Sequence, residues 1–168
     1  VFLQRNNNNN GKFSALEESS PSPLSSAPLD GVVILVTGST SGIGRSLVRW
    51  TFQQGATIVA MGRSTSKLKA LQDELVPQEN DQTRFFSVVA DMADLNSVSA
   101  SVDVLQTTLS QAAIPKIDIV VCNAGVWVPS DDNDPPPSTV QGYDLTFGVN
   151  YLSHVLLTEK LMRIRSED

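Results

Sequence analysis

The chain has 168 residues, 40% of them hydrophobic, and a formal net charge of −6, which suits one soluble globular domain. The acidic balance and the lack of a Lys/Arg cluster argue against a nucleic-acid partner, because phosphate binding needs clustered cations. The single cysteine, Cys122, excludes an internal disulfide. No apolar run approaches the roughly 20 residues that span a bilayer. The compartment stays open, with a soluble cytoplasmic protein as the default expectation.

Residues 1–29 are predicted to form a disordered tail. They contain a run of asparagines at 6–10 and a Ser/Pro-rich stretch up to Pro28. Such a composition offers few apolar side chains whose burial would offset the entropy cost of ordering the chain. The globular part is therefore expected to comprise residues 30–168.

From residue 31 onward, apolar runs alternate with helical patterns. Four runs rich in β-branched residues predict buried strands, at 32–37, 57–61, 84–90 and 117–122. Apolar residues that recur every three or four positions predict a helix after each strand. These helices are marked by Ile43, Leu47 and Trp50; by Leu68, Leu71 and Leu75; by Leu95, Val98, Val102, Leu105 and Leu109; and by Leu145, Val149, Leu152 and Leu156.

The resulting order is βαβαβαβα. Strands that are apolar throughout, joined by helices, require a parallel sheet covered on both faces. The sequence therefore predicts an α/β fold of the Rossmann type, an incomplete doubly wound parallel sheet of about four βα units with strand order 3-2-1-4. A ligand is expected at the carboxyl ends of the strands, beside the reversal point between strands 1 and 4.

The first strand-to-helix turn carries the sharpest motif, Thr-Gly-Ser-Thr-Ser-Gly-Ile-Gly at residues 37–44. Glycines there let the backbone turn tightly and approach a pyrophosphate, whose charge is favoured at a helix N-terminus. An ordinary tight turn also uses glycine, and the spacing differs from the general Gly-x-Gly-x-x-Gly fingerprint. The position between a predicted strand and a predicted helix nevertheless favours nucleotide binding.

This turn resembles that of the short-chain dehydrogenase/reductase family, and further motifs follow in the family's order. Asp91 and Met92 follow the third strand, Asn123-Ala124-Gly125 ends the fourth, and Asn150 lies in the last helix. The resemblance implies that Asp91 contacts adenine, that the Asn-Ala-Gly turn stabilises the sheet beside the cofactor, and that Asn150 belongs to a catalytic Asn-Ser-Tyr-Lys tetrad. It also implies cofactor-binding roles for Thr37, Gly38, Ser39, Ser41, Gly42, Ile43 and Gly44.

The end of the second strand bears on the choice of cofactor. A carboxylate there would hold a ribose 2′-hydroxyl and repel a 2′-phosphate. The chain instead has Arg63, whose planar fork can donate paired hydrogen bonds to phosphate. Arg45 is either a second contributor of positive potential or a helix-surface charge. The sequence therefore favours NADP over NAD, and residues 30–168 are interpreted as an NAD(P)-binding Rossmann domain.

The family's general acid or base is a Tyr with a Lys four residues later. Only Tyr143 and Tyr151 occur, and the corresponding positions hold Phe147 and Val155, so both tyrosines are interpreted as helix-packing aromatics. We expect the chain to be the N-terminal part of an NADP-dependent oxidoreductase and to be inactive alone. The alternative is a truncated, non-catalytic cofactor-binding or interaction module. The resemblance leaves a homodimer open.

The stretch 142–158 is similar to the retinol-dehydrogenase-like branch of the family. This likeness implies that the intact protein moves hydride between NADP(H) and a small-molecule alcohol or carbonyl of lipophilic character.

The remaining candidate groups favour structural interpretations. His154 is the sole histidine, so no His-based triad or multi-histidine metal site can form, and a packing or surface role is expected. Asp131, Asp132 and Asp134 resemble a calcium cluster only weakly, and a solvated loop is favoured. Cys122 is expected to be a small buried hydrophobe. No metal site is predicted.

Overall fold

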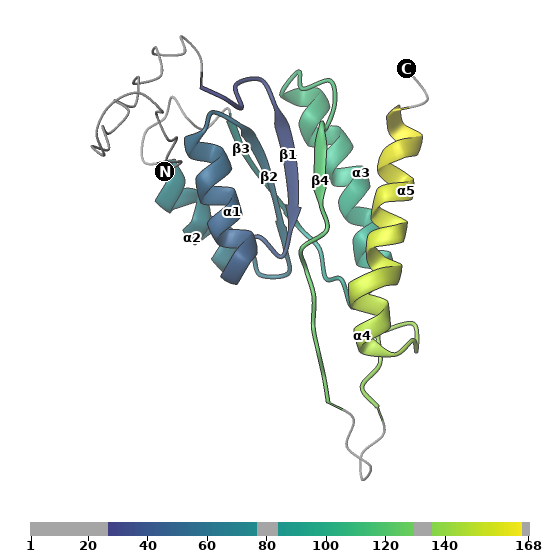
Figure 1. The fold of residues 1–168 in the computed structure, drawn as a ribbon. Helices are drawn as coiled ribbons and strands as arrows, with labels where there is room; N and C mark the ends of the chain where they lie inside the picture. The colour runs from purple at the N-terminus through teal and green to yellow at the C-terminus, as the bar shows by residue number, and fades with distance from the viewer. Residues whose placement is uncertain (1–26, 77–83, 130–135, 166–168) are drawn as a thin grey trace, which may run out of the picture.

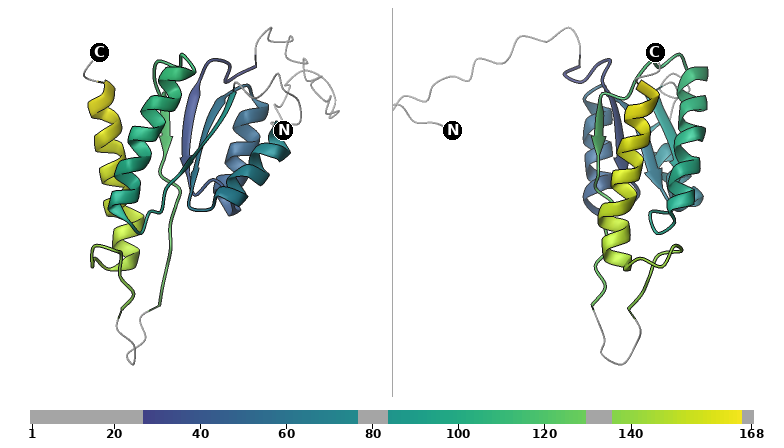
Figure 2. Two further views of the ribbon diagram at one scale, coloured as in Figure 1. Left: turned by 180° about the vertical axis from the view of Figure 1, so that it is seen from behind. Right: turned by 90° about the vertical axis from the view of Figure 1, so that its right-hand side faces the viewer.

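Four parallel strands form the centre of the computed structural model, which describes residues 27–76, 84–129 and 136–165. The strands are β1 (Val33–Thr37), β2 (Thr57–Gly62), β3 (Phe85–Val89) and β4 (Ile119–Val121), arranged in the order β3-β2-β1-β4 (Figure 1). The α/β class and the predicted strand order are therefore confirmed. Helices α1 (Gly42–Gln53) and α2 (Thr65–Leu75) cover one face, and α3 (Leu95–Gln111) and α5 (Ser153–Arg165) cover the other (Figures 1 and 2).

The alternation of side chains along β1 and β2 builds two separate apolar cores. Ile34 and Val36 pack in one cluster with Val48 of α1 and Leu68 of α2. Leu35, between them, belongs to the other cluster, with residues of α3 and α5. Because successive side chains of a strand point to opposite faces, a strand covered on both sides must be apolar at every position.

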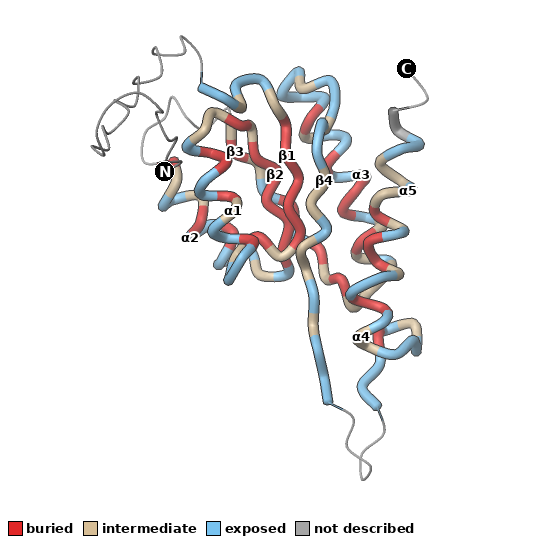
Figure 3. The backbone as a smooth tube through the Cα atoms, in the orientation of Figure 1, coloured by how far each residue is buried: buried red, intermediate tan, exposed pale blue. Residues whose placement is uncertain are grey.

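β4 departs from the expectation of a long buried strand. Only residues 119–121 pair with β1, and Ile119 is 44% exposed (Figure 3). β4 is the last strand of the described sheet, so one of its edges has no neighbouring strand there. The predicted burial of Cys122 is wrong for the same reason: the residue is exposed, although partial desolvation raises the pKa of its thiol.

The buried face of α1 also differs from the prediction. Ile43 and Trp50 are 80% and 57% exposed, whereas Val48, Thr51 and Phe52 are buried. The helix buries Gly44 against Gly38 and Asn123, so the core-facing positions follow from Gly44 and not from Ile43.

The last helix is interrupted where a continuous one was predicted. The three-residue α4 (Leu145–Phe147) leads into a π-helical turn, Gly148–Leu152, and then into α5. A π turn inserts one residue per turn and rotates the following face. Val149 is buried as predicted, but Leu157 is fully buried, whereas Leu152 and Leu156 are only partly covered.

Neither tyrosine packs into the core, so their predicted packing role is wrong. Tyr143 is 47% and Tyr151 is 56% exposed. Tyr151 stacks on Phe147 one turn earlier, with ring centroids 5.3 Å apart. The aromatic pair therefore lies on the open side of the helix.

Residues 27–29, which the sequence prediction assigns to the tail, lie within the described part of the chain. Leu29, assigned to the tail, packs against the core on the α1 side, and its N–H donates to the carbonyl of Gln54 at 2.9 Å. The asparagine run and the aspartates at 131, 132 and 134 lie outside the described residues. In the part of the chain that the structure describes, no helix has both the length and the apolarity required to cross a membrane.

Candidate nucleotide-binding site

A cavity of about 440 Å³ opens at the carboxyl ends of the parallel strands. It begins at the turn between β1 and α1, passes the ends of β2 and β3, and reaches the segment after β4. Nine predicted cofactor-binding residues line it: Gly38, Ser41, Ile43, Arg63, Asp91, Met92, Asn123, Ala124 and Gly125. Sequence reasoning missed its other lining residues, which include Thr40, Ser64, Lys67, Val126, Leu145 and Val149.

The N-terminus of α1 carries uncapped donors at this cavity. Ser41 is in the N-cap position, yet its side chain accepts no hydrogen bond from the helix. The equivalent side chains Ser64 and Asp94 do cap α2 and α3. The first turn of α1 also has no acidic residue. Free N–H groups and the positive end of the helix dipole therefore favour an anion at Ser41 and Ile43, which line the cavity.

Two glycines let the turn lie close to the segment after β4. Gly38 has φ +64°, and a Cβ there would stand 2.9 Å from Ala124 Cα. A Cβ on Gly44 would come within 2.4 Å of Asn123 Nδ2. The contacts explain why Gly44 does not line the cavity: it provides close packing behind the cavity wall.

Thr37 joins β1 to the Asn-Ala-Gly turn. Its side chain is fully buried, and its Oγ1 accepts the backbone N–H groups of Asn123 and Ala124, each at 2.9 Å. Asn123 returns a hydrogen bond from Nδ2 to the Thr37 carbonyl, also at 2.9 Å. Thr37 therefore acts behind the cavity, where it fixes the turn that forms its wall.

His154 of α5 makes a further contact with this threonine. Nε2 lies 2.9 Å from Thr37 Oγ1, and Nδ1 lies 3.2 Å from the carbonyl oxygen of Asn150. The residue is only 7% exposed. Burial lowers the pKa of His154, and the hydrogen bond to the Asn150 carbonyl opposes this effect. Burial therefore favours the neutral form of the ring, and the expected packing role understates its polar contacts.

The end of β2 presents cationic groups to the cavity. Arg63 and Lys67 both line it, with Ser64 between them at the start of α2. Ser39 does not face the cavity, because it is fully buried and its hydroxyl donates to the Met61 carbonyl at 3.1 Å. Of the two interpretations of Arg45, the surface charge is the one observed. It pairs with Glu74 of α2, does not line the cavity, and holds the pKa of that carboxyl below its usual range.

The end of the neighbouring strand β3 also lines the cavity. Asp91 Oδ1 accepts the N–H of Ala93 at 2.9 Å, while the Asp91 N–H donates to Ser97 Oγ at 3.0 Å. Met92 is 7% exposed and lines the cavity with Asp91. One Asp91 carboxylate oxygen is thus occupied by the turn, and a carboxylate has further acceptor sites for a ligand.

Asn150 clamps the chain beyond the Asn-Ala-Gly turn. Its Nδ2 donates to the Val126 carbonyl and its Oδ1 accepts the Val126 N–H, both at 2.8 Å. Asn150 lies in the π-helical turn and does not line the cavity. The side-chain amide of Asn150 therefore fixes the backbone of Val126, and Val126 lines the cavity.

Four predicted cofactor-binding residues, Thr37, Ser39, Gly42 and Gly44, stand outside the cavity lining. Gly42 has φ +52° with open space around the position of a Cβ, so it serves the backbone of the turn. Among the described residues, no group of three or more His, Cys, Asp or Glu side chains is placed to hold a metal ion.

Comparisons with known proteins agree with this geometry. Residues 32–167 match the family of short chain dehydrogenases. A short-chain dehydrogenase/reductase of Phomopsis amygdali is 33% identical over 135 residues, which cover 79% of this chain and 37% of that protein.

Solved structures show the same fold. A 3-ketoacyl-(acyl-carrier-protein) reductase from Brucella melitensis, complexed with NADH, superposes with a TM-score of 0.61 and 28% identity, covering 80% of this chain and 50% of that chain. A blue fluorescent protein from a metagenomic library, in complex with NADPH, superposes with a TM-score of 0.62 and 28% identity, covering 80% of this chain and 51% of that chain. The chain thus spans about half the length of these solved chains and less of its curated relative.

Proposed function

Because this chain belongs to the short-chain dehydrogenase/reductase family, whose members are oxidoreductases, we propose that its cavity binds NADP(H) in preference to NAD(H). The observation that carries the proposal is the end of β2, where Arg63 lines the cavity and the segment from Met61 to Ser64 offers no carboxylate. A carboxylate at this place would repel a ribose 2′-phosphate, whereas a guanidinium attracts it.

The residues around the cavity fit the parts of such a dinucleotide. The uncapped first turn of α1 would hold the pyrophosphate. Arg63, with Ser64 and Lys67 beside it, would hold the 2′-phosphate. Asp91 and Met92 would contact the adenine. The turn at residues 123–125, held by Thr37, would border the nicotinamide side, because it follows the strand on the other side of β1.

For the whole protein, we propose transfer of hydride between NADP(H) and a lipophilic alcohol or carbonyl. The cofactor supplies the hydride chemistry when bound, and protein groups orient it and move a proton. The likeness of residues 142–158 to the retinol-dehydrogenase-like branch supports the lipophilic substrate, as do the exposed Trp127 and Val128 beyond the cavity. Asn150 is proposed as the tetrad asparagine, acting through its hold on Val126.

A titration of the purified chain with NADPH and NADH tests the cofactor assignment. We expect tighter binding of NADPH by calorimetry, and the variant Arg63→Ala should lose about tenfold or more of its NADPH affinity, since a hydrogen bond to a charged group contributes about 1.5–3 kcal/mol. NADH affinity should change little, because NADH has no 2′-phosphate.

Arg45→Ala is the matched control, since it removes a nearby arginine that pairs with Glu74 outside the cavity. This variant should keep the preference of the parent chain. Equal or tighter binding of NADH by the unmodified chain would refute NADP as the cofactor.

A further inference from the structure

We propose that His154 is a positioning residue for the cavity, acting through an unprotonated Nε2 that accepts the hydroxyl proton of Thr37. In this role it fixes the orientation of the hydroxyl that holds the turn at Asn123 and Ala124. The inference rests on the proposed function only in taking NADP(H) as the ligand of that turn. The hydrogen-bond geometry is independent of any ligand.

The hydrogen count at Thr37 determines the direction of the bond. A hydroxyl has one proton to donate and two lone pairs to accept with. Both lone pairs of Thr37 Oγ1 are engaged by the N–H groups of Asn123 and Ala124, each at 2.9 Å. The proton must therefore go elsewhere. His154 Nε2 lies at 2.9 Å, while the Val121 carbonyl, its other neighbour, lies at 3.4 Å.

The other ring nitrogen leads to the same tautomer. Nδ1 of His154 faces the Asn150 carbonyl at 3.2 Å, and a carbonyl oxygen can only accept. Nδ1 therefore carries the hydrogen, and Nε2 of the neutral ring is free to accept. The contacts of both ring nitrogens thus require a hydrogen on Nδ1 and none on Nε2, so the geometry assigns the Nδ1–H tautomer.

The ring thereby connects three parts of the site. Thr37 ends β1, the turn at Asn123 follows β4, and Asn150 lies in the π-helical turn that clamps Val126. If Nε2 carried a proton, the Nε2–H and the Thr37 hydroxyl would be two donors facing each other. To accept the Nε2–H, Thr37 Oγ1 would have to release one of the two backbone amides. The turn that borders the cavity would then lose one of its anchors.

An apolar side chain at position 154 would fill space but leave the hydroxyl without its near acceptor. His154→Leu tests this loss. His154→Gln is the conservative variant, because its amide oxygen offers an acceptor at a reach similar to that of Nε2. Ser153→Ala is the control: Ser153 is fully buried at the start of the same helix, and its hydroxyl donates to the Val149 carbonyl in the preceding π-helical turn.

The first measurement is the tautomer of the unmodified chain, read from the nitrogen chemical shifts of the His154 ring by two-dimensional NMR at neutral pH. His154 is the sole histidine, so the signals need no further assignment. We expect the pattern of a protonated Nδ1 and a bare Nε2. The opposite tautomer, or a mixture dominated by it, would overturn the proposal even if NADPH binds normally.

The second measurement is NADPH affinity. We expect His154→Leu to weaken binding by about tenfold, since leaving a buried polar group unsatisfied costs about 1–3 kcal/mol. His154→Gln should restore most of the affinity, and Ser153→Ala should match the parent. Equal losses in the Gln and Leu variants, or none in the Leu variant, would overturn the role of the acceptor.

If the Leu variant does not fold, the ring tautomer and the NADPH affinity of His154→Gln test the positioning role. Loss of NADPH binding in a folded Gln variant would contradict the proposal. Failure of the parent chain to bind NADPH would refute the proposed function alone. The ring tautomer and the backbone amide shifts of Asn123 and Ala124 in the Gln variant still test the positioning role in that case.

Discussion

At the scale of single residues, the cavity depends on Thr37, whose side chain does not line it. Thr37 Oγ1 holds two backbone amides of the turn after β4, and Asn123 returns a bond to the Thr37 carbonyl. Such reciprocal contacts over 86 residues of sequence fix the relative position of two strand ends. A buried and fully bonded threonine is more restrictive than an apolar residue, because hydrogen bonds have direction.

Gly38 provides a prediction at this scale. Replacement by Ala should lower the free energy of unfolding by more than about 2 kcal/mol. The alanine would have to keep a left-handed backbone conformation, and its Cβ would also lie 2.9 Å from Ala124 Cα. Thermal or urea denaturation measures the loss, and NADPH titration should show weakened binding.

Gly31→Ala separates the two causes of that loss. Gly31 has a similar positive φ, +76°, but nothing lies within 4 Å of its Cβ position. This control should lose only about 1–2 kcal/mol from backbone strain. If the two variants lose equal stability, close packing against Ala124 is not the reason for glycine at position 38.

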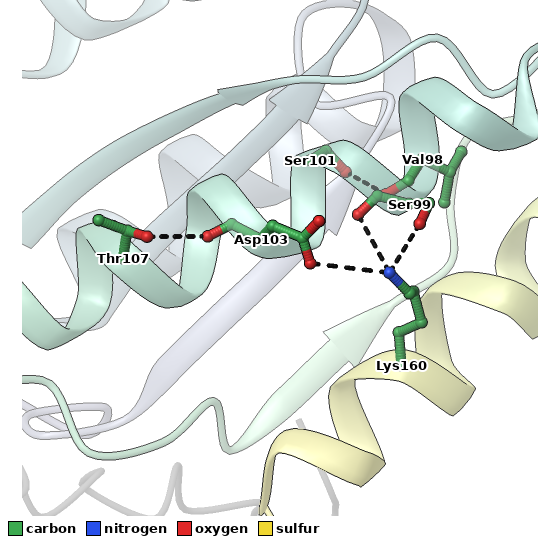
Figure 4. A network of polar contacts seen from close by, with 6 residues as sticks. All are labelled: Val98, Ser99, Ser101, Asp103, Thr107 and Lys160. Atoms are coloured by element: carbon green, nitrogen blue, oxygen red, sulfur yellow. Dashed lines mark hydrogen bonds and ion pairs between the residues drawn. The ribbon is translucent and has the colours of Figure 1, made fainter.

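At the scale of elements, α3 and α5 are joined by more than apolar contact. Lys160 of α5 extends to α3, where its Nζ donates to Ser99 Oγ at 2.6 Å and lies 3.7 Å from Asp103 Oδ1 (Figure 4). Both helices pack on the same face of the sheet, and α5 leads directly from the turn that carries Asn150. These contacts of Lys160 with Ser99 and Asp103, the clasp between the two helices, therefore help to fix the position of α5 relative to α3.

Lys160→Met tests the clasp. The aliphatic part of the side chain is retained, so the loss should reflect the polar contacts, about 1 kcal/mol in the free energy of unfolding. Lys69→Met is the matched control, because Lys69 makes a surface pair with Asp73 within α2 and is 73% exposed. Surface pairs of this kind contribute little. A stability loss in the control as large as in Lys160→Met would contradict a specific role for the clasp.

At the scale of the whole molecule, the ends of the strands share one cavity, and neither Tyr143 nor Tyr151 lines it. Arg63, Asp91 and the turn at residues 123–125 line one continuous cavity. The two tyrosines of the chain lie on exposed surfaces, and neither has a lysine four residues later. Binding and catalysis are thus expected to separate in this chain.

We accordingly predict that the purified 168-residue chain binds NADPH but shows no steady oxidation of it with carbonyl compounds. The physical reason is that an ordinary phenol, with a pKa near 10, is a poor general acid or base at neutral pH unless a nearby cation stabilises its anion. NADPH absorbance, followed with short and lipophilic aldehydes and ketones, measures turnover. Steady oxidation above the rate in buffer would contradict the prediction and would disfavour a non-catalytic module.

The sequence by itself determined the arrangement of the sheet. Strands that are buried on both faces must be apolar throughout, so 32–37 and 57–61 were recognisable, and the connections between parallel strands follow a fixed hand. The glycine turn, Asp91 and Asn123 were recognisable because their residue types occur at the ends of those strands. Nine of the predicted cofactor-binding residues line the cavity for this reason.

Only the tertiary structure decided which residues stand behind the wall of the cavity. Thr37, Ser39 and Gly44 are neighbours of the lining residues in sequence, but they form buried contacts with β2 or with Asn123. The partner of Arg45, on α2, is likewise a long-range contact. Such contacts join residues far apart in the chain, so no local pattern carries them.

The same limit applied to the last helix and to β4. A single inserted residue in the π-helical turn shifts the buried face toward Leu157, and helical periodicity read along the sequence assumes that no residue is inserted. The exposure of Cys122 depends on which strand ends the sheet. The contact of His154 with Thr37, 117 residues apart, exists because α5 packs beside the carboxyl end of β1, and packing alone brings those two atoms together.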